Sequence, residues 1–366
     1  MRPRVLFVGR GRLVLPLPPW LAKKWEALSE VFDVRVLNAG SGSGDPRFRM
    51  LPDGAAAFYS RLPFEVAREL RSFRADVVVA SDPFLGTAVV AARALARSRA
   101  KVVVEVHGDP RTFSRGYGSP LRRLVARPAD AVARVGLRLP DATRALSQFT
   151  SSIVEEVRGV PATASFPTYS DLDAFAEPPL VPLPEERRIV FVGALERYKN
   201  VDGLAAAWRA VAAQAPDARL TVVGRGSRRA VVDALVAEVP GVVHHDSLEP
   251  PAVAAELDAA RALVLPSWPE GLGRVVLEAF ARGRTVVATD AGGIPDIVTD
   301  GVDGLLVPRA DTAALVAALA RILDDRDLAV RLGAAARATY TRWHQTPADF
   351  AERYRDLVDR VLAGAR

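Results

Sequence analysis

The sequence predicts an α/β protein made of two doubly wound, Rossmann-like domains. Continuous Val-rich runs alternate with helical patterns along almost the whole chain, which is typical of parallel strands covered on both faces. A strand-like "VLFVG" near the start is matched by "IVFVG" after a proline-rich stretch, so the same arrangement starts twice. A length of 366 residues is sufficient for two such domains.

Apolar runs in the first half predict four strands. Two stretches with helical spacing, 19–31 and 64–73, lie between them. Strand followed by helix, repeated, predicts a parallel sheet, and we expect a first domain over residues 1–178. The predicted strands are 4–9, 32–38, 75–81 and 100–108.

The second half repeats this arrangement after residues 171–188, which hold four prolines and no helical period. Such a segment is typical of an interdomain linker. We expect a second domain over 186–342 and a C-terminal helix within 343–366, beginning at a Thr-Pro start signal and covering 347–363. Helices are expected over 201–215 and 273–283, and strands over 187–193, 218–224, 260–267, 284–290 and 303–308.

Composition excludes several classes of protein. The chain has no cysteine, which excludes a disulfide scaffold and a thiolate zinc site. No apolar run approaches the ~18 residues of a membrane span. Arg10 and Arg12 interrupt the apolar start, which therefore predicts a first strand and not a signal peptide. We expect a cytoplasmic protein, with peripheral membrane contact left open.

Charge is distributed unevenly. Residues 1–180 carry 26 Lys+Arg against 18 Asp+Glu, whereas the remainder carries 23 against 25. A basic half suits an anionic acceptor or an anionic lipid surface, and the arginine-rich helical stretch 119–139 is the best place for lipid contact. Only four of the 49 basic residues are lysine, so GC-rich coding and a solvated basic face explain the same data.

The most informative segment is "PSWPEGLGRVVLEAFARG", residues 266–283. Glu270 and a pair of glycines follow a predicted strand, and Glu278 lies about one turn inside the helix that follows. This is the carboxyl edge of a parallel sheet, where doubly wound folds bind ligands. The start of that helix suits a diphosphate, and a carboxylate can accept hydrogen bonds from a sugar diol. The residues concerned are Glu270, Gly271, Leu272, Gly273, Arg274, Val275 and Glu278.

Together with "TVVATDAGGIPD", this segment resembles the donor-binding signature of glycosyltransferase family 4, retaining enzymes with the GT-B fold. Asp296 stands where the family usually has glutamate. The resemblance implies two domains facing across a cleft, with the C-terminal helix crossing back onto the first. The matching positions are Pro266, Ser267, Glu270, Gly271, Gly273, Glu278, Ala279, Gly283, Gly292 and Gly293.

A second match surrounds Lys199. "FVGALERYKN" resembles the family's first turn in the C-terminal domain, where a lysine binds the donor diphosphate. Lys199 is the only lysine in the last 265 residues, which favours a functional role. The family's arginine is replaced by Ala194, and Arg197 is a candidate to supply its charge. Glycines of this turn and of "VVGRGS" are expected beside the nucleotide: Gly193, Gly224 and Gly226.

The match is thinner in the first half. His107 ends a Val-rich strand, where family members often carry a histidine near the donor sugar. The first loop departs from the family's usual glycine-rich pattern, so its acceptor-side residues, Gly9, Gly11 and Arg12, identify no acceptor.

The resemblance implies transfer of a hexose-type sugar from a nucleotide-diphosphate sugar to an acceptor hydroxyl, with retention at the anomeric carbon. His107, Glu270 and Lys199 are the candidate catalytic residues. No metal and no cofactor besides the nucleotide sugar is expected, and neither is nucleic acid as a partner. A small molecule, a glycan or a lipid-linked molecule remains open as the acceptor. Two alternatives also remain: a catalytically silent nucleotide-sugar-binding protein, and a phosphorylase or epimerase of the same fold.

Overall fold

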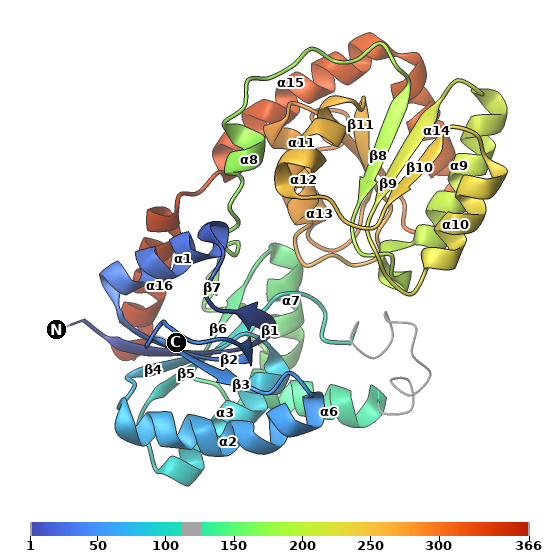
Figure 1. The fold of residues 1–366 in the computed structure, drawn as a ribbon. Coiled ribbons are helices and arrows are strands. Elements are labelled where there is room, and N and C mark those ends of the chain that lie inside the picture. The colour runs from blue at the N-terminus through green and yellow to red at the C-terminus, as the bar shows by residue number, and fades with distance from the viewer. Residues whose placement is uncertain (1, 112–125, 365–366) are drawn as a thin grey trace. The chain divides into compact units, whose positions relative to one another are not determined.

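The structure is a computed structural model of the chain, and it describes residues 2–111 and 126–364. The chain divides into two compact units. Unit 1 contains residues 2–110, 126–169 and 345–364, and unit 2 contains 111 and 170–344. Each unit is a parallel sheet with helices on both faces, which confirms the predicted fold class (Figure 1).

Unit 1 is built on a seven-stranded sheet in the order β3-β2-β1-β4-β5-β6-β7. Leu62 of α2 and Val89 of α3 pack on one face of this sheet, and Trp25 of α1 and Phe350 of α16 pack on the other. The strands are β1 (Arg4–Val14), β2 (Asp33–Ser41), β3 (Phe48–Leu51), β4 (Val77–Ala80), β5 (Lys101–Val106), β6 (Ala142–Ala145) and β7 (Ala164–Ser165). The helices are α1 (Pro19–Val31), α2 (Ala55–Ser72), α3 (Pro83–Ala96), α6 (Ala126–Arg138), α7 (Gln148–Arg158) and α16 (Pro347–Leu362).

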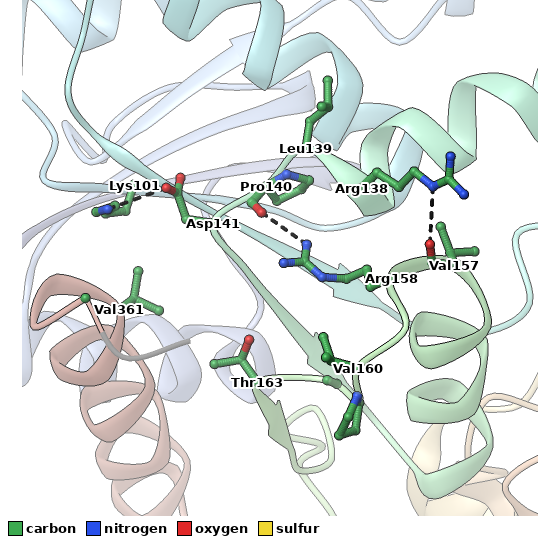
Figure 2. Close-up of a pocket in the computed structure, with 13 residues that line it drawn as sticks. Lys101, Arg138, Leu139, Pro140, Asp141, Val157, Arg158, Val160, Thr163 and Val361 are labelled. Atoms are coloured by element: carbon green, nitrogen blue, oxygen red, sulfur yellow. Dashed lines mark hydrogen bonds and ion pairs between the residues drawn. The ribbon is translucent and has the colours of Figure 1, made fainter.

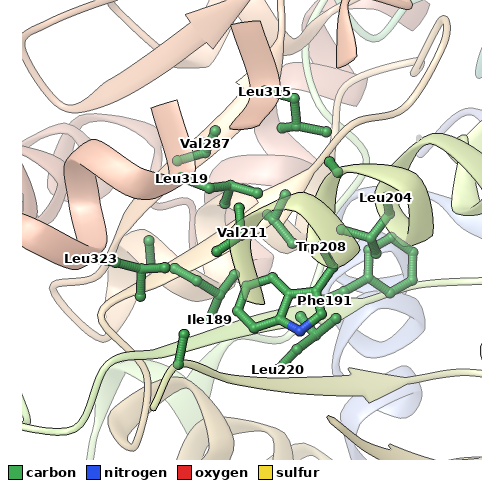
Figure 3. Packing of buried hydrophobic residues seen from close by; sticks show 14 of the residues in the cluster. Ile189, Phe191, Leu204, Trp208, Val211, Leu220, Val287, Leu315, Leu319 and Leu323 are labelled. Carbon is green, nitrogen blue, oxygen red and sulfur yellow. The ribbon is translucent and has the colours of Figure 1, made fainter. Parts of the chain in front are cut away.

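Unit 2 has a six-stranded sheet in the order β10-β9-β8-β11-β12-β13. Trp208 of α9 is fully buried among Ile189, Leu220 and Leu319, which joins α9 and α14 to one face of the sheet (Figure 3). The strands are β8 (Arg188–Val192), β9 (Arg219–Val223), β10 (Val242–His245), β11 (Ala262–Leu265), β12 (Thr285–Thr289) and β13 (Gly304–Val307). The helical segments are α8 (Asp173–Ala176), η1 (Arg197–Lys199), α9 (Val201–Gln214), α10 (Arg229–Glu238), α11 (Pro250–Asp258), α12 (Arg274–Ala281), α13 (Ile294–Ile297), α14 (Thr312–Asp324) and α15 (Arg326–Trp343).

All nine predicted strands are present, but short strands were missed. β3, β6, β7 and β10 have four residues or fewer, and their sequences lack a continuous apolar run. β6 reads "ATRA" and carries Arg144, which is fully buried. Side-chain partners, and not the apolar pattern, make that position compatible with the interior.

The expected first loop is a strand. β1 continues through Gly9, Gly11 and Arg12 to Val14, because its pairing with β2 resumes at Leu13 after a register shift. Gly40 on β2 lies so close to β1 that a Cβ there would stand 2.0 Å from the Leu13 carbonyl oxygen.

The expected linker is part of unit 2. The division between the units falls between Tyr169 and Ser170, before the proline-rich stretch. Prolines lack the N–H needed for a sheet, so this stretch cannot form a regular backbone ladder, and side chains of unit 2 bond its carbonyls. The buried Arg282 donates to the carbonyl oxygens of Pro178 and Pro179, both at 2.8 Å, and Arg284 donates to Pro182 at 3.2 Å.

The C-terminal helix α16 packs within unit 1, beside α1 (Figure 1). It starts at the predicted Thr-Pro signal, where Thr346 and Asp349 form a reciprocal capping box. Tyr354 is buried edge-on against Phe7 of β1, with ring centroids 5.7 Å apart. The last helix of the chain therefore completes the core of the first unit.

We expect Arg282→Met to lower the free energy of unfolding of unit 2 by about 3–5 kcal/mol, because it leaves the buried Phe175 carbonyl and the Asp258 carboxylate without the Arg282 donor. Urea unfolding followed by circular dichroism measures this change. Arg321→Met on the exposed side of α14 is the control, and equal losses in the two variants would contradict the role given to Arg282.

Candidate functional site

The carboxyl edge of the unit 2 sheet brings several predicted residues together. Gly193 follows β8, Gly224 follows β9, and Glu270 lies in the loop after β11. Lys199 ends the short helix η1, which comes from the β8 loop. These loops start from neighbouring strands, so the sheet order places them next to one another.

Two of the glycines are required by close backbone packing. A Cβ at Gly224 would lie 1.9 Å from the Gly193 carbonyl oxygen, and one at Gly226 would lie 2.5 Å from that of Leu195. The Leu195 N–H also donates to the Arg225 carbonyl at 2.9 Å. The loops after β8 and β9 are therefore packed backbone against backbone, which only glycine allows at these two positions.

Lys199 and Glu270 form a largely enclosed ion pair in which the ammonium donates to the carboxylate. Their loops are joined directly, since the Trp268 N–H donates to the Tyr198 carbonyl at 2.7 Å. The Glu270 carbonyl in turn accepts from the Gly293 N–H at 2.9 Å. Gly293, the second glycine of the double glycine in the sequence motif, thus holds the Glu270 loop by a backbone hydrogen bond.

Glu278 lies on α12 close to this pair. Gly273 adopts a left-handed conformation, with φ of 87°, and the helix starts at Arg274. The Glu278 carboxylate is buried and accepts from Arg274 Nε at 2.9 Å. Burial raises the pKa of Glu278, although Arg274 and Lys199 oppose the shift. An ionised Glu278 is therefore a strong hydrogen-bond acceptor held at a cost in stability.

Three other predicted donor residues differ in their surroundings. The side chains of Leu272 and Val275 are buried in the core of unit 2, so only their backbone can reach a ligand. Arg197 is half-buried, and within the described residues no ion pair involves it. Ala194 beside it is exposed.

The predicted catalytic His107 and the predicted acceptor-side residues lie at the carboxyl edge of the unit 1 sheet. His107 follows β5, its side chain is 40% exposed, and its Nε2 lies 3.1 Å from Glu105 Oε2. Gly11 accepts a hydrogen bond from the Asn38 amide through its carbonyl. Arg12 pairs instead with the exposed Asp53 at 2.9 Å.

Sequence reasoning missed two carboxylates at this edge, Glu105 and Asp82. Asp82 caps α3 by accepting from the Leu85 N–H at 2.8 Å, and burial raises its pKa against the opposing charges of His107 and Arg10. Asp before Pro after a strand is a helix-start signal. Glu105 could have been found because residues two apart on a strand share a face.

A cavity of about 1070 Å³ lies elsewhere in unit 1, at the amino edge of its sheet (Figure 2). None of the predicted site residues lines it. Arg158 of α7 donates to the Leu137 and Pro140 carbonyls at the end of α6, and Arg138 of α6 donates to the Val157 carbonyl of α7. Each helix thus satisfies the other's C-terminal carbonyls, which explains these arginines without a ligand.

Comparison with known proteins identifies the family. Residues 186–325 match the family model described as glycosyl transferases group 1, and residues 26–166 match glycosyltransferase family 4. The chain belongs to the family 4 glycosyltransferases. D-inositol 3-phosphate glycosyltransferase of Thermobispora bispora is 34% identical over 194 residues, which is 49% of this chain and 45% of that protein. The corresponding protein of Nocardia farcinica is 31% identical over 68% of this chain and 56% of its own length. The chain spans about half the length of such curated relatives.

Solved structures show the same fold. Sucrose-phosphate synthase from Thermosynechococcus elongatus superposes with a TM-score of 0.78 at 21% identity, over 98% of this chain and 99% of its own. Anabaena HepE in complex with UDP-glucose gives 0.72 at 17% identity, over 97% and 99%. The family 4 chain described here therefore has the predicted GT-B fold.

The raised pKa of Glu278 predicts a pH-dependent effect of Glu278→Gln on stability. The folded wild type binds this proton more tightly than the unfolded chain, so it loses stability as pH rises from 4.5 through the raised pKa. The variant lacks that loss. Its melting temperature relative to wild type should be higher at about pH 8 than at about pH 4, as measured by calorimetry. A difference in melting temperature that does not change with pH would show that ionisation of Glu278 does not lower the stability of the folded protein.

Proposed function

We propose that this family 4 protein transfers a hexose-type sugar from a nucleotide-diphosphate sugar to an acceptor hydroxyl, with retention and without a metal. The observation that carries the proposal is the grouping of Lys199, Glu270 and Glu278 around the start of α12 in unit 2. A cation, a helix amino end and two carboxylates match the diphosphate, ribose and sugar parts of such a donor.

The donor's leaving group needs stabilisation as its bond to the sugar breaks. Lys199 and the N–H groups at the start of α12 supply fixed positive charge for the diphosphate, with Arg197 as a second cation. Glu278 accepts from the ribose hydroxyls, and Glu270 accepts from those of the sugar. Lys199 and Glu270 compensate each other before the donor arrives, so neither is left as an uncompensated buried charge.

Transfer then proceeds on one face of the sugar. The bond between the anomeric carbon and the phosphate oxygen breaks, and the acceptor oxygen bonds to that carbon. The acceptor's proton passes to the departing phosphate, so no protein carboxylate is needed as a nucleophile. His107 in unit 1 orients the transferred sugar through its hydroxyl groups. The names of the relatives include D-inositol 3-phosphate, and the crystal structure of HepE is a complex with UDP-glucose, so UDP-sugars are the first donors to test.

The first test is isothermal titration with nucleoside diphosphates. We expect Lys199→Ala to weaken binding by roughly 10- to 100-fold, the value of a lost charged hydrogen bond. Lys101→Ala is the matched control, because that lysine is the first residue of β5 and lies at the amino edge of the unit 1 sheet, away from all predicted site residues. If no nucleoside diphosphate binds the wild type, the proposal loses its main support.

Turnover with a panel of nucleotide sugars separates the alternatives, and product mass spectrometry identifies the sugar and acceptor. We expect NMR of the product to show a retained anomeric configuration, and we expect EDTA to leave the transfer rate unchanged. Glu270→Ala should lose most of the transferase activity. Binding without turnover for any acceptor would favour a silent binding protein. Phosphate-dependent cleavage would favour a phosphorylase of the same fold, and epimerisation of the donor would favour an epimerase of that fold.

We also propose peripheral contact of unit 1 with anionic membranes through α6. Within the described ranges no helix is both long and apolar enough to cross a bilayer. Of the predicted stretch 119–139, residues 119–125 lie outside the described residues. The outward face of α6 has apolar and cationic side chains side by side, and the one acid of this helix, Asp130, is only partly exposed, which suits the surface of a charged bilayer. Its exposed residues include Arg127, Val132, Arg134, Val135, Arg138 and Leu139 just beyond its end.

Vesicle co-sedimentation tests this contact. Wild type should bind phosphatidylcholine vesicles with about 30% phosphatidylglycerol and not neutral vesicles, and Arg127→Glu/Arg134→Glu should lower the partition coefficient by roughly 30-fold. Arg321→Glu/Arg331→Glu, exposed on α14 and α15, carries the same charge change as a control. An equal loss of vesicle binding in the two double variants would show that net charge, and not α6, causes the binding.

A further inference from the structure

We infer that Glu105 is a positioning residue for His107, and that the terminal helix α16 fixes Glu105 through Tyr354. The inference deepens the proposed function, because it rests on the role given there to His107. Glu105 lies on β5, on the face of the sheet that α1 and α16 cover. Its side chain is buried beneath the half-exposed His107 ring.

The two oxygens of this carboxylate have different partners. Oε2 lies 3.1 Å from Nε2 of His107. Oε1 accepts from the Arg144 guanidinium on β6 and from the Tyr354 hydroxyl on α16. The carboxylate therefore joins the exposed ring to two elements of the core, one of them 249 residues away in the sequence.

Arg144 is itself held from several sides. Its Nη2 donates to the Phe166 carbonyl at 3.0 Å and to Thr168 Oγ1 at 3.2 Å. Its guanidinium lies over the Phe166 ring at 4.3 Å. A fully buried guanidinium with this many contacts has one orientation, so Oε1 of Glu105 has a fixed partner.

The charge state of Glu105 decides what it does to the ring. Burial would raise the pKa of Glu105, but Arg144, the His107 hydrogen bond and Lys24 of α1 together hold it well below its usual range. An ionised carboxylate can only accept, so His107 donates its proton from Nε2. In the neutral form of the ring, a proton held on Nε2 leaves Nδ1 as a hydrogen-bond acceptor for a substrate hydroxyl.

Stability alone does not account for this arrangement. A buried ion pair can often be replaced by apolar residues of similar volume without loss of stability. Here the pair lies in an otherwise apolar core that includes Phe7, Trp25 and Phe350, yet one carboxylate oxygen is directed to a ring that is 40% exposed. That direction points to control of His107.

NMR of the full chain tests the inference without turnover. The chain has four histidines, so the ring N–H signals can be assigned. Wild type should show a downfield, exchange-protected His107 Nε2–H proton, which Glu105→Gln abolishes and Tyr354→Phe weakens. Tyr340→Phe is the matched control, since it removes a tyrosine hydroxyl that contacts His344 Nδ1 at 2.8 Å in unit 2. An unchanged His107 signal in both unit 1 variants would overturn the inference.

Kinetics supply the second readout. Glu105→Gln should lower kcat by roughly tenfold to a hundredfold, the cost of a misplaced group, while the affinity for nucleoside diphosphate stays unchanged. Tyr354→Phe keeps the ring packing and should give a smaller loss in the same direction. Full activity in folded Glu105→Gln would contradict the positioning role. If wild type has no transferase activity, the proposed function fails, and the NMR comparison still decides whether Glu105 and Tyr354 hold the ring.

Discussion

Main-chain carbonyl oxygens that no backbone N–H reaches need another hydrogen-bond donor, and among the described residues arginine side chains supply many of these bonds. Arg282 and Arg284 hold the proline-rich stretch onto unit 2, where prolines offer no N–H of their own. Arg158 and Arg138 close the ends of two helices in unit 1. A planar guanidinium has five N–H donors in a fixed arrangement and can reach several carbonyls at once, whereas a lysine ammonium has three. The abundance of arginine, which coding bias explains equally well from sequence, therefore has a structural use.

The same constraint explains the form of the candidate site in unit 2. Glycines allow the loops of unit 2 to pack backbone against backbone, and their hydrogen bonds fix the loop that carries Glu270. Rigid loops keep charged groups in place without reorganisation, which is what stabilisation of a leaving group requires. Lys199 compensates Glu270, whereas Glu278 remains buried with a partner that is half-exposed. Burial of the ionised Glu278 carboxylate thus costs stability at the place where we propose that it accepts hydrogen bonds from the donor.

In unit 1, the last helix of the chain takes part in the core beneath His107. α16 contributes aromatic rings to that core and the hydroxyl of Tyr354 to the Glu105 carboxylate. Because α16 belongs to unit 1, its packing is linked through Glu105 to the carboxyl edge of that sheet, where His107 lies. The charge of Glu105 is maintained there by Arg144 and Lys24, which come from two other elements.

The sequence by itself determined the fold class, the long strands, the terminal helix and the family, because these depend on periodicity and on motifs that are local in the chain. It also singled out Lys199 and the two glutamates of unit 2. It did not reveal that residues 171–188 belong to unit 2, that the first loop is a strand, or that Glu105 and Tyr354 meet. Only the tertiary structure decided these, because each depends on partners more than twenty residues away, and hydrogen-bond satisfaction of a buried group leaves no periodic pattern in the sequence.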